Sequence, residues 1–253
     1  MSLDTSLDLD RSPTDDTKWR GDRLVFVVAT DPGAARPVLR MLDGSRHAVT
    51  RLEPGIAPLV CTTFGQLRGL YLAARDLGGD PRSRTEEEQA RLAIEARTHA
   101  SDGARGVARS LVDHTSELHE RGVVAEPVRG FASQWQVLAA VLPDARYVTI
   151  VRDPRCAPVT DGAASQKPDA ATIARTWKET VDAAREAQRR VGTDRVLVLR
   201  LDELCQARGP ERLCRFLDLD ESFADAAPFR LATTPALPAE VVAEIEVLLA
   251  DDL

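Results

Sequence analysis

The chain has 253 residues, of which 43% are hydrophobic and 29% are charged, an ordinary balance for a folded globular protein. Its net charge of −7 gives no general basic field, so we expect neither nucleic acid nor an anionic membrane as a partner. Any site for an anion must therefore be built locally. No apolar run approaches the ~20 residues that a helix needs to cross a bilayer.

Residues 1–21 are acidic and polar, without the basic start and apolar core of a signal peptide, and we expect a disordered tail there. The cysteines show no CxxC spacing, and the two histidines of DHTSELHE (113–120) do not share one helix face, so no metal site is predicted. We therefore expect a cytoplasmic protein with four reduced thiols: Cys61, Cys156, Cys205 and Cys214.

The first predicted strand covers residues 23–30, RLVFVVAT. Its continuous apolar run, Leu24 to Val28, indicates a strand that is covered on both faces, as in a parallel sheet. Asp31-Pro32-Gly33 ends this strand, and Pro37 is placed to open a helix. The order strand, turn, helix predicts the start of a βα unit.

Two long helical patterns come next. The segment 55–63 fits either a short strand or the start of a helix, and 64–77 has the apolar spacing of an amphipathic helix. Residues 85–88, Thr-Glu-Glu-Glu, form a capping-box pattern that opens a second helix. We expect this helix to be interrupted near 101–103 and to resume over 107–118.

The second half of the chain alternates strands with helices. Strands are predicted at 123–125, 147–151 and 195–201, and helices at 133–142, 170–191, 210–217 and 238–249. This alternation predicts an α/β fold with a mainly parallel sheet. No linker divides the chain, so we expect one domain over 22–253 with a helical excursion at about 64–122.

The strand at 147–151 ends abruptly in Arg152-Asp153-Pro154-Arg155, and a hydroxyl follows at Thr160. Ligands of parallel sheets bind beyond the carboxyl ends of the strands, and the planar donor fork of arginine suits phosphate or sulfate. Arg152 and Thr160 are therefore candidate anion ligands. In the alternative interpretation, Arg152 pairs with a carboxylate such as Asp153 and Thr160 caps a helix; the residues alone leave both open.

Two segments resemble the sulfotransferase family. PDARYVTIVRDPR (143–155) is similar to the segment that binds the 3′-phosphate of the family's nucleotide, where a serine follows the first arginine by eight residues; here Thr160 lies at that distance. VLVLRLDELCQARGPERLCRFLDL (196–219) resembles the family's next strand, turn and helix. The resemblance extends over about 137–219 and implies a P-loop-like three-layer fold, with helices on both faces of the sheet.

The resemblance also implies a function. Sulfotransferases transfer a sulfuryl group from 3′-phosphoadenosine 5′-phosphosulfate (PAPS) to an acceptor, which for this chain implies a hydroxyl or amine of a small molecule, with no metal. Arg152 and Thr160 would hold the 3′-phosphate of PAPS. The helical excursion and the C-terminal stretch would form the acceptor pocket.

The family's loop for the 5′-phosphosulfate corresponds to residues 31–36 of this chain, DPGAAR. The residues implied to bind there are Gly33, Ala34, Ala35 and Arg36. The chain departs from the family's pattern, because the in-register lysine or arginine and both hydroxyls are missing and Asp31 adds a negative charge. Arg36 is the candidate for a substitute cation that stabilises the transferring group.

The strand end VVAEPVR (123–129) corresponds to the family's Lys-Thr-Pro or Lys-Thr-His segment, which carries acid/base groups. Glu126 is the candidate general base there, and the alternative is a surface carboxylate. A second hypothesis keeps the fold without PAPS chemistry, as a binding or regulatory module or an enzyme of a different reaction. A third is another phosphate-handling α/β enzyme, although neither GxxxxGK[ST] nor GxGxxG occurs in the chain.

Overall fold

A computed structural model describes the chain over 21–30, 32–44, 48–51, 55–76, 84–119, 123–156, 169–206, 208–219 and 237–250. The described residues form a five-stranded sheet in which every pair of neighbours is parallel and the order is β2-β3-β1-β4-β5. The strands are β1 (Leu24–Ala29), β2 (Ala48–Thr50), β3 (Val123–Val128), β4 (Arg146–Val151) and β5 (Val196–Arg200).

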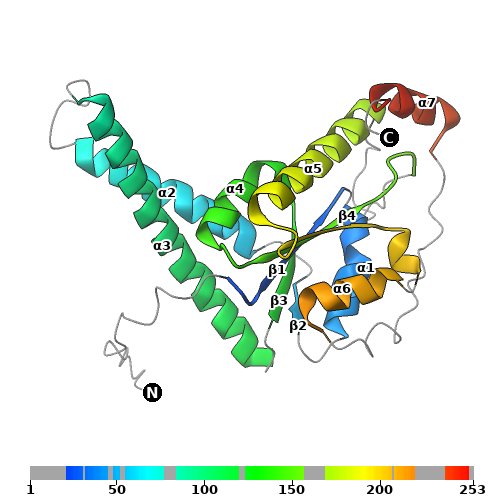
Figure 1. Ribbon diagram of the computed structural model, residues 1–253, viewed down its shortest axis with the longest axis horizontal. Coiled ribbons are helices and arrows are strands. Elements are labelled where there is room, and N and C mark those ends of the chain that lie inside the picture. The colour runs from blue at the N-terminus through cyan, green and yellow to red at the C-terminus, as the bar shows by residue number, and fades with distance from the viewer. Residues whose placement is uncertain are drawn as a thin grey trace, which may run out of the picture.

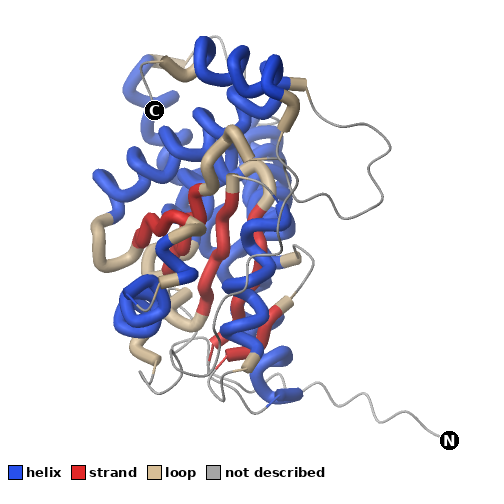
Figure 2. Tube along the Cα trace, turned by 90° about the vertical axis from the view of Figure 1, so that its right-hand side faces the viewer, coloured by secondary structure: helices blue, strands red, loops and turns tan. Residues whose placement is uncertain are grey.

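Helices cover both faces of this sheet (Figures 1 and 2). The helices are α1 (Pro32–Asp43), α2 (Ile56–Asp76), α3 (Glu86–His119), α4 (Phe131–Val141), α5 (Ala170–Val191), α6 (Arg208–Leu217) and α7 (Ala239–Leu248). One apolar core joins the sheet to α2, α3, α4 and α5, and a second joins it to α1 and α6. The predicted three-layer α/β fold is thus confirmed.

The central strand β1 shows why the sheet has two cores. Leu24, Phe26 and Val28 point into the first core, whereas Val25 and Val27 point into the second, because successive side chains of a strand face opposite sides. All five residues are buried, as the continuous apolar run predicts for a strand inside a parallel sheet.

Helix α1 differs from the prediction. It begins at Pro32, five residues before the expected start at Pro37, and Pro37 lies inside it. Proline suits the first helical position because an N–H there would have no acceptor within the helix. Alanine, which follows at positions 34 and 35, has the highest helix propensity of all residue types. Residues 32–36, which we expected to form a phosphate-binding loop, are therefore the first turns of a helix.

Helix α3 is continuous, so the interruption expected near 101–103 is wrong. Gly103 faces α2, and a Cβ atom at this position would lie 2.4 Å from Cδ1 of Leu67. The glycine therefore allows close packing of α2 and α3, which lie side by side and project from the sheet as a hairpin (Figure 1).

The predicted capping box opens α3. The backbone N–H of Glu88 donates to Oγ1 of Thr85 at 3.2 Å, and the N–H of Thr85 donates to the Glu88 carboxylate at 2.8 Å. The segment 55–63 belongs almost wholly to α2, which settles its ambiguity in favour of a helix start. No helix in the described part of the chain has both the length and the apolarity that a membrane span requires.

Candidate active site

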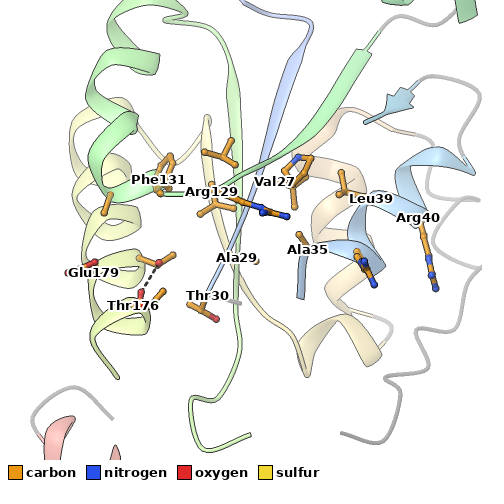
Figure 3. A pocket seen from close by; sticks show the side chains of 17 residues that line it. Val27, Ala29, Thr30, Ala35, Leu39, Arg40, Arg129, Phe131, Thr176 and Glu179 are labelled. Carbon is orange, nitrogen blue, oxygen red and sulfur yellow. Dashed lines mark hydrogen bonds between the residues drawn. The ribbon is translucent and has the colours of Figure 1, made fainter. Parts of the chain in front are cut away.

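A cavity of about 560 Å³ opens at the carboxyl ends of β1 and β3 (Figure 3). The end of β1, the first turns of α1, the turn from β3 into α4 and one face of α5 form its walls. No described residue that lines it belongs to the helical excursion, 64–122, or to the C-terminal stretch, the two segments expected to form the acceptor pocket. The parallel sheet itself positions this cavity.

The cavity lies beside the point where the topology of the sheet reverses. β1 and β4 are neighbours, yet α1 leads from β1 to β2 on one side and α5 leads from β4 to β5 on the other. Open parallel sheets bind their ligands in the crevice outside such a pair of strands. Thr30 joins the two strand ends, because its N–H donates to the carbonyl of Ile150 at 3.2 Å and its Oγ1 accepts from the N–H of Arg152 at 3.0 Å.

Three arginines line the cavity. Arg36 and Arg40 project from α1, one turn apart, and Arg129 follows the last residue of β3. In Figure 3 the side chain of Arg129 extends from the end of β3 toward the α1 side, where Ala35 lies. The chain has a net charge of −7, so these three arginines form a local concentration of positive charge within an acidic protein.

Helix α5 supplies the polar side chains on the opposite wall, where Thr176, Glu179 and Thr180 line the cavity. The three positions share one helix face because they are three and four residues apart. Oγ1 of Thr180 donates to the carbonyl of Thr176 at 2.8 Å (Figure 3). Among the described residues that line the cavity, Glu179 is the one carboxylate, and no lysine, histidine or cysteine accompanies it.

Arg152 lies in a second cavity, of about 370 Å³, on the other side of α5. Trp177, Val181 and Arg185 form the α5 wall of this cavity, and their spacing of four residues places them on one helix face. The Arg152 residue is only 8% exposed, and its carbonyl accepts a hydrogen bond from Nε1 of Trp177 at 2.8 Å.

The second cavity is also rich in arginine. Arg155 and Arg200 line it together with Arg152 and Arg185. Asp153 accepts hydrogen bonds from the backbone N–H and the guanidinium of Arg155, and this pairing lowers the pKa of Asp153. The two cavities thus place clusters of cationic side chains on either side of the same helix.

The model of the sulfotransferase family matches residues 74–225, which is more than half of the chain. The chain belongs to the sulfotransferase family. The matched segment of this sulfotransferase contains β3, β4, β5 and the Arg152 region, but not the β1–α1 turn. A search of curated proteins found no match.

One solved sulfotransferase structure shares the fold, and two others show a weaker similarity. The sulfotransferase domain of the Synechococcus PCC 7002 olefin synthase has a TM-score of 0.52 and 17% identity, over 93% of this chain and 97% of that one. A sulfotransferase domain from the curacin biosynthetic pathway has a TM-score of 0.48 and 13% identity, over 89% and 96%. The sulfotransferase STF9 from Mycobacterium avium has a TM-score of 0.40 and 16% identity, over 92% and 68%.

The structure brings together only some of the site residues expected for this sulfotransferase. Ala35 and Arg36 line the larger cavity and Arg152 lines the smaller one. Gly33 and Ala34 are buried in the first turn of α1 and line neither cavity. Thr160 lies outside the described residues. Within the described ranges, no group of three histidine, cysteine, aspartate or glutamate side chains could hold a metal ion.

Glu126 is placed differently from both interpretations of the sequence. It is fully buried, so the surface-carboxylate alternative is wrong, and it does not line the larger cavity. Its carboxylate accepts hydrogen bonds from the N–H groups of Gly55 (3.2 Å), Ile56 (2.8 Å) and Ala57 (2.6 Å), and Nε of Arg51 lies 3.9 Å away. Glu126 therefore caps the N-terminus of α2 and holds that helix to β3.

The charge state of Glu126 reflects opposing effects. Burial is the largest and raises the pKa of Glu126, whereas the three N–H groups and Arg51 favour the ionised form. The structure gives this residue a role in packing the helical hairpin onto the sheet. Glu179, which sequence patterns did not single out, is the carboxylate that faces the larger cavity.

Proposed function

We propose that this sulfotransferase transfers a sulfuryl group from PAPS to a hydroxyl or amine of a small-molecule acceptor. One observation carries the proposal: two arginine-lined cavities flank α5 at the carboxyl edge of the sheet. PAPS carries anionic groups at two ends, a 3′-phosphate and a 5′-phosphosulfate, and the two cavities offer a cationic site for each.

The smaller cavity is the proposed site of the 3′-phosphate. Arg152 is nearly buried there, and a buried guanidinium forms stronger charge-assisted hydrogen bonds than an exposed one. Thr160 remains the proposed hydroxyl ligand. Because Thr30 ties the ends of β1 and β4 together, it fixes the position of Arg152 relative to the larger cavity.

The larger cavity is the proposed site of sulfuryl transfer, with room for the phosphosulfate and the reacting part of the acceptor. Transfer of this kind depends on positioning and on neutralising charge, which Arg36, Arg40 and Arg129 are placed to do. Glu179 is the proposed general base, because it is the carboxylate on the wall of that cavity, and Glu126 is not proposed for this role.

A second candidate function is nucleotide binding without transfer. It is favoured by the start of α1 at Pro32, which buries Gly33 and Ala34 inside a helical turn instead of exposing them in a loop. Residues 32–36 also carry no hydroxyl for the 5′ group. In this alternative the chain would hold the nucleotide through Arg152 and catalyse nothing.

Both candidates are tested by measuring the release of 3′-phosphoadenosine 5′-phosphate (PAP) from PAPS with a panel of phenols, alcohols and amines. We expect release that depends on the acceptor, with a rate at least about 100-fold lower in Glu179→Gln, the lower end for loss of a general base. Thermal stabilisation by PAP should be equal in wild type and variant. Stabilisation without release would favour the second candidate, and the absence of both would contradict both.

A further inference from the structure

Arg129 lies in the larger cavity without a partner. Among the described residues, it makes no ion pair and no hydrogen bond, whereas Arg155 and Arg200 of the smaller cavity bond to Asp153 and Asp202. An arginine that pairs with no carboxylate keeps all of its N–H donors for a ligand.

The backbone fixes the place of Arg129. Val128 pairs with Val28 in the parallel register, so the next residue, Arg129, lies beside the end of β1. Gly130 then adopts a φ of 68°, in the left-handed region that favours glycine, and turns the chain into α4. Arg129 is thus held between a central strand of the sheet and a fixed turn, on the wall of the cavity.

The turn from β1 into α1 brings no positive side chain to the same place. Thr30 and residues 32–35, Pro-Gly-Ala-Ala, are uncharged, and Asp31 is acidic by sequence. The first cation of α1, Arg36, comes more than one helical turn after its start. Arg36, Arg40 and Arg129 are all exposed, so they differ in backbone position and not in burial. Directly beside the end of β1, the backbone register therefore places a cation from the adjacent strand, β3.

We propose that Arg129 contacts the transferring sulfuryl group and supplies from β3 the positive charge that the β1–α1 turn lacks. This rests on the proposed function. Its role is electrostatic, because a guanidinium stays protonated and cannot act as a base. As the S–O bond to the phosphate breaks and the bond to the acceptor oxygen or nitrogen forms, Arg129 neutralises the charge on the group, Glu179 receives the acceptor proton, and PAP leaves with the electron pair of the broken bond.

The test is calorimetric binding of PAPS and of PAP to the full chain, without an acceptor. These ligands differ only in the sulfuryl group, so the ratio of their affinities isolates contacts with that group. In Arg129→Gln we expect PAPS to bind at least about tenfold more weakly while PAP changes about twofold or less, since a charge-assisted hydrogen bond is worth about tenfold or more. Arg129→Lys should recover part of the difference, because it keeps the charge but not the planar fork.

The matched control is Arg68→Gln, which removes one exposed positive charge on α2, outside the cavity. It should leave both affinities unchanged, and unchanged circular dichroism would show that each variant folds. An equal loss of PAPS and PAP affinity in Arg129→Gln would overturn the inference, as would no loss of either. If wild type binds neither nucleotide, the proposed function fails and this inference with it, whereas binding of both at an unaltered ratio contradicts only the inference.

Discussion

The backbone N–H of Arg152 donates a hydrogen bond to Oγ1 of Thr30 at 3.0 Å, although the two residues are 122 positions apart in the chain. The bond joins the ends of β1 and β4, the neighbouring strands from which the chain departs in opposite directions. Thr30 lines the larger cavity and Arg152 the smaller one. The relative position of the two cavities therefore depends in part on a single threonine hydroxyl.

Replacing that hydroxyl tests the connection. Thr30→Val keeps the shape of the side chain but removes the acceptor, so we expect the free energy of unfolding to fall by about 1 kcal/mol. The affinity for PAP should also fall, because Arg152 is less well fixed. Urea denaturation and calorimetry measure the two effects.

Two matched variants sharpen this comparison. Thr30→Ser retains an acceptor and should restore both properties, and Thr62→Val changes an exposed threonine of α2 and should alter neither. Equal behaviour of Thr30→Val and Thr30→Ser would show that the hydrogen bond contributes nothing to either property.

The cap that Glu126 provides to α2 predicts a local effect. Glu126→Ala leaves the N–H groups of Gly55, Ile56 and Ala57 without their acceptor, at a cost of about 2 kcal/mol or more in the free energy of unfolding. Glu126→Gln keeps the shape and one acceptor oxygen, so its cost should be smaller. Amide hydrogen exchange at Ile56 and Ala57 should accelerate most in the alanine variant; exchange that is unchanged there would rule out the cap.

The raised pKa of Glu126 predicts a dependence on pH. A carboxyl group whose pKa in the folded state lies above its ordinary value of 4.5 binds its proton more tightly in the folded than in the unfolded chain. Its contribution to stability is complete below about pH 4.5 and is lost as the pH rises through the raised pKa. Because glutamine does not titrate, the stability of wild type relative to Glu126→Gln should be highest in acid and decline toward neutral pH. A parallel pH profile of the two proteins would contradict the shift.

Two helical glycines predict opposite effects of the same substitution. Gly106 in α3 has open space where a Cβ would lie, so Gly106→Ala should stabilise the protein by about 0.5–1 kcal/mol through helix propensity. A Cβ on Gly209 in α6 would lie 2.2 Å from the carbonyl oxygen of Glu203, so Gly209→Ala should destabilise it by about 1–3 kcal/mol. Thermal denaturation checks both: a stabilising Gly209→Ala would refute the close approach of α6 to Glu203, and a destabilising Gly106→Ala would refute the open space beside α3.

The parts of the fold with strong local patterns were predictable from the sequence. The bounds of α5, 170–191, agree with the prediction because its apolar positions keep helical spacing and Asp169 caps its start through the N–H of Thr172. The start of α1 was missed because both Pro32 and Pro37 suit a first helical turn, and only the intact helix shows which one takes that place.

The site residues were less predictable, because they depend on register and packing between distant segments. Nothing local to Glu126 shows that the N-terminus of α2 lies over its carboxylate. The place of Arg129 follows from the pairing of β3 with β1, and that of Glu179 from which face of α5 turns toward β1. The spacing of Thr176, Glu179 and Thr180, which places them on one helix face, is a local pattern that could have indicated the polar wall, but it was not singled out.

The central claim, that Arg152 and its cavity hold the 3′-phosphate of the donor nucleotide, is tested most directly by calorimetry with PAP and with adenosine 5′-phosphate. The two ligands differ only in that phosphate, so the ratio of their affinities measures its binding. We predict that wild type favours PAP by at least about tenfold, the worth of one charge-assisted hydrogen bond, and that Arg152→Gln abolishes the preference in a folded protein. Equal affinities for the two ligands in wild type, or a preference that survives in Arg152→Gln, would contradict the claim.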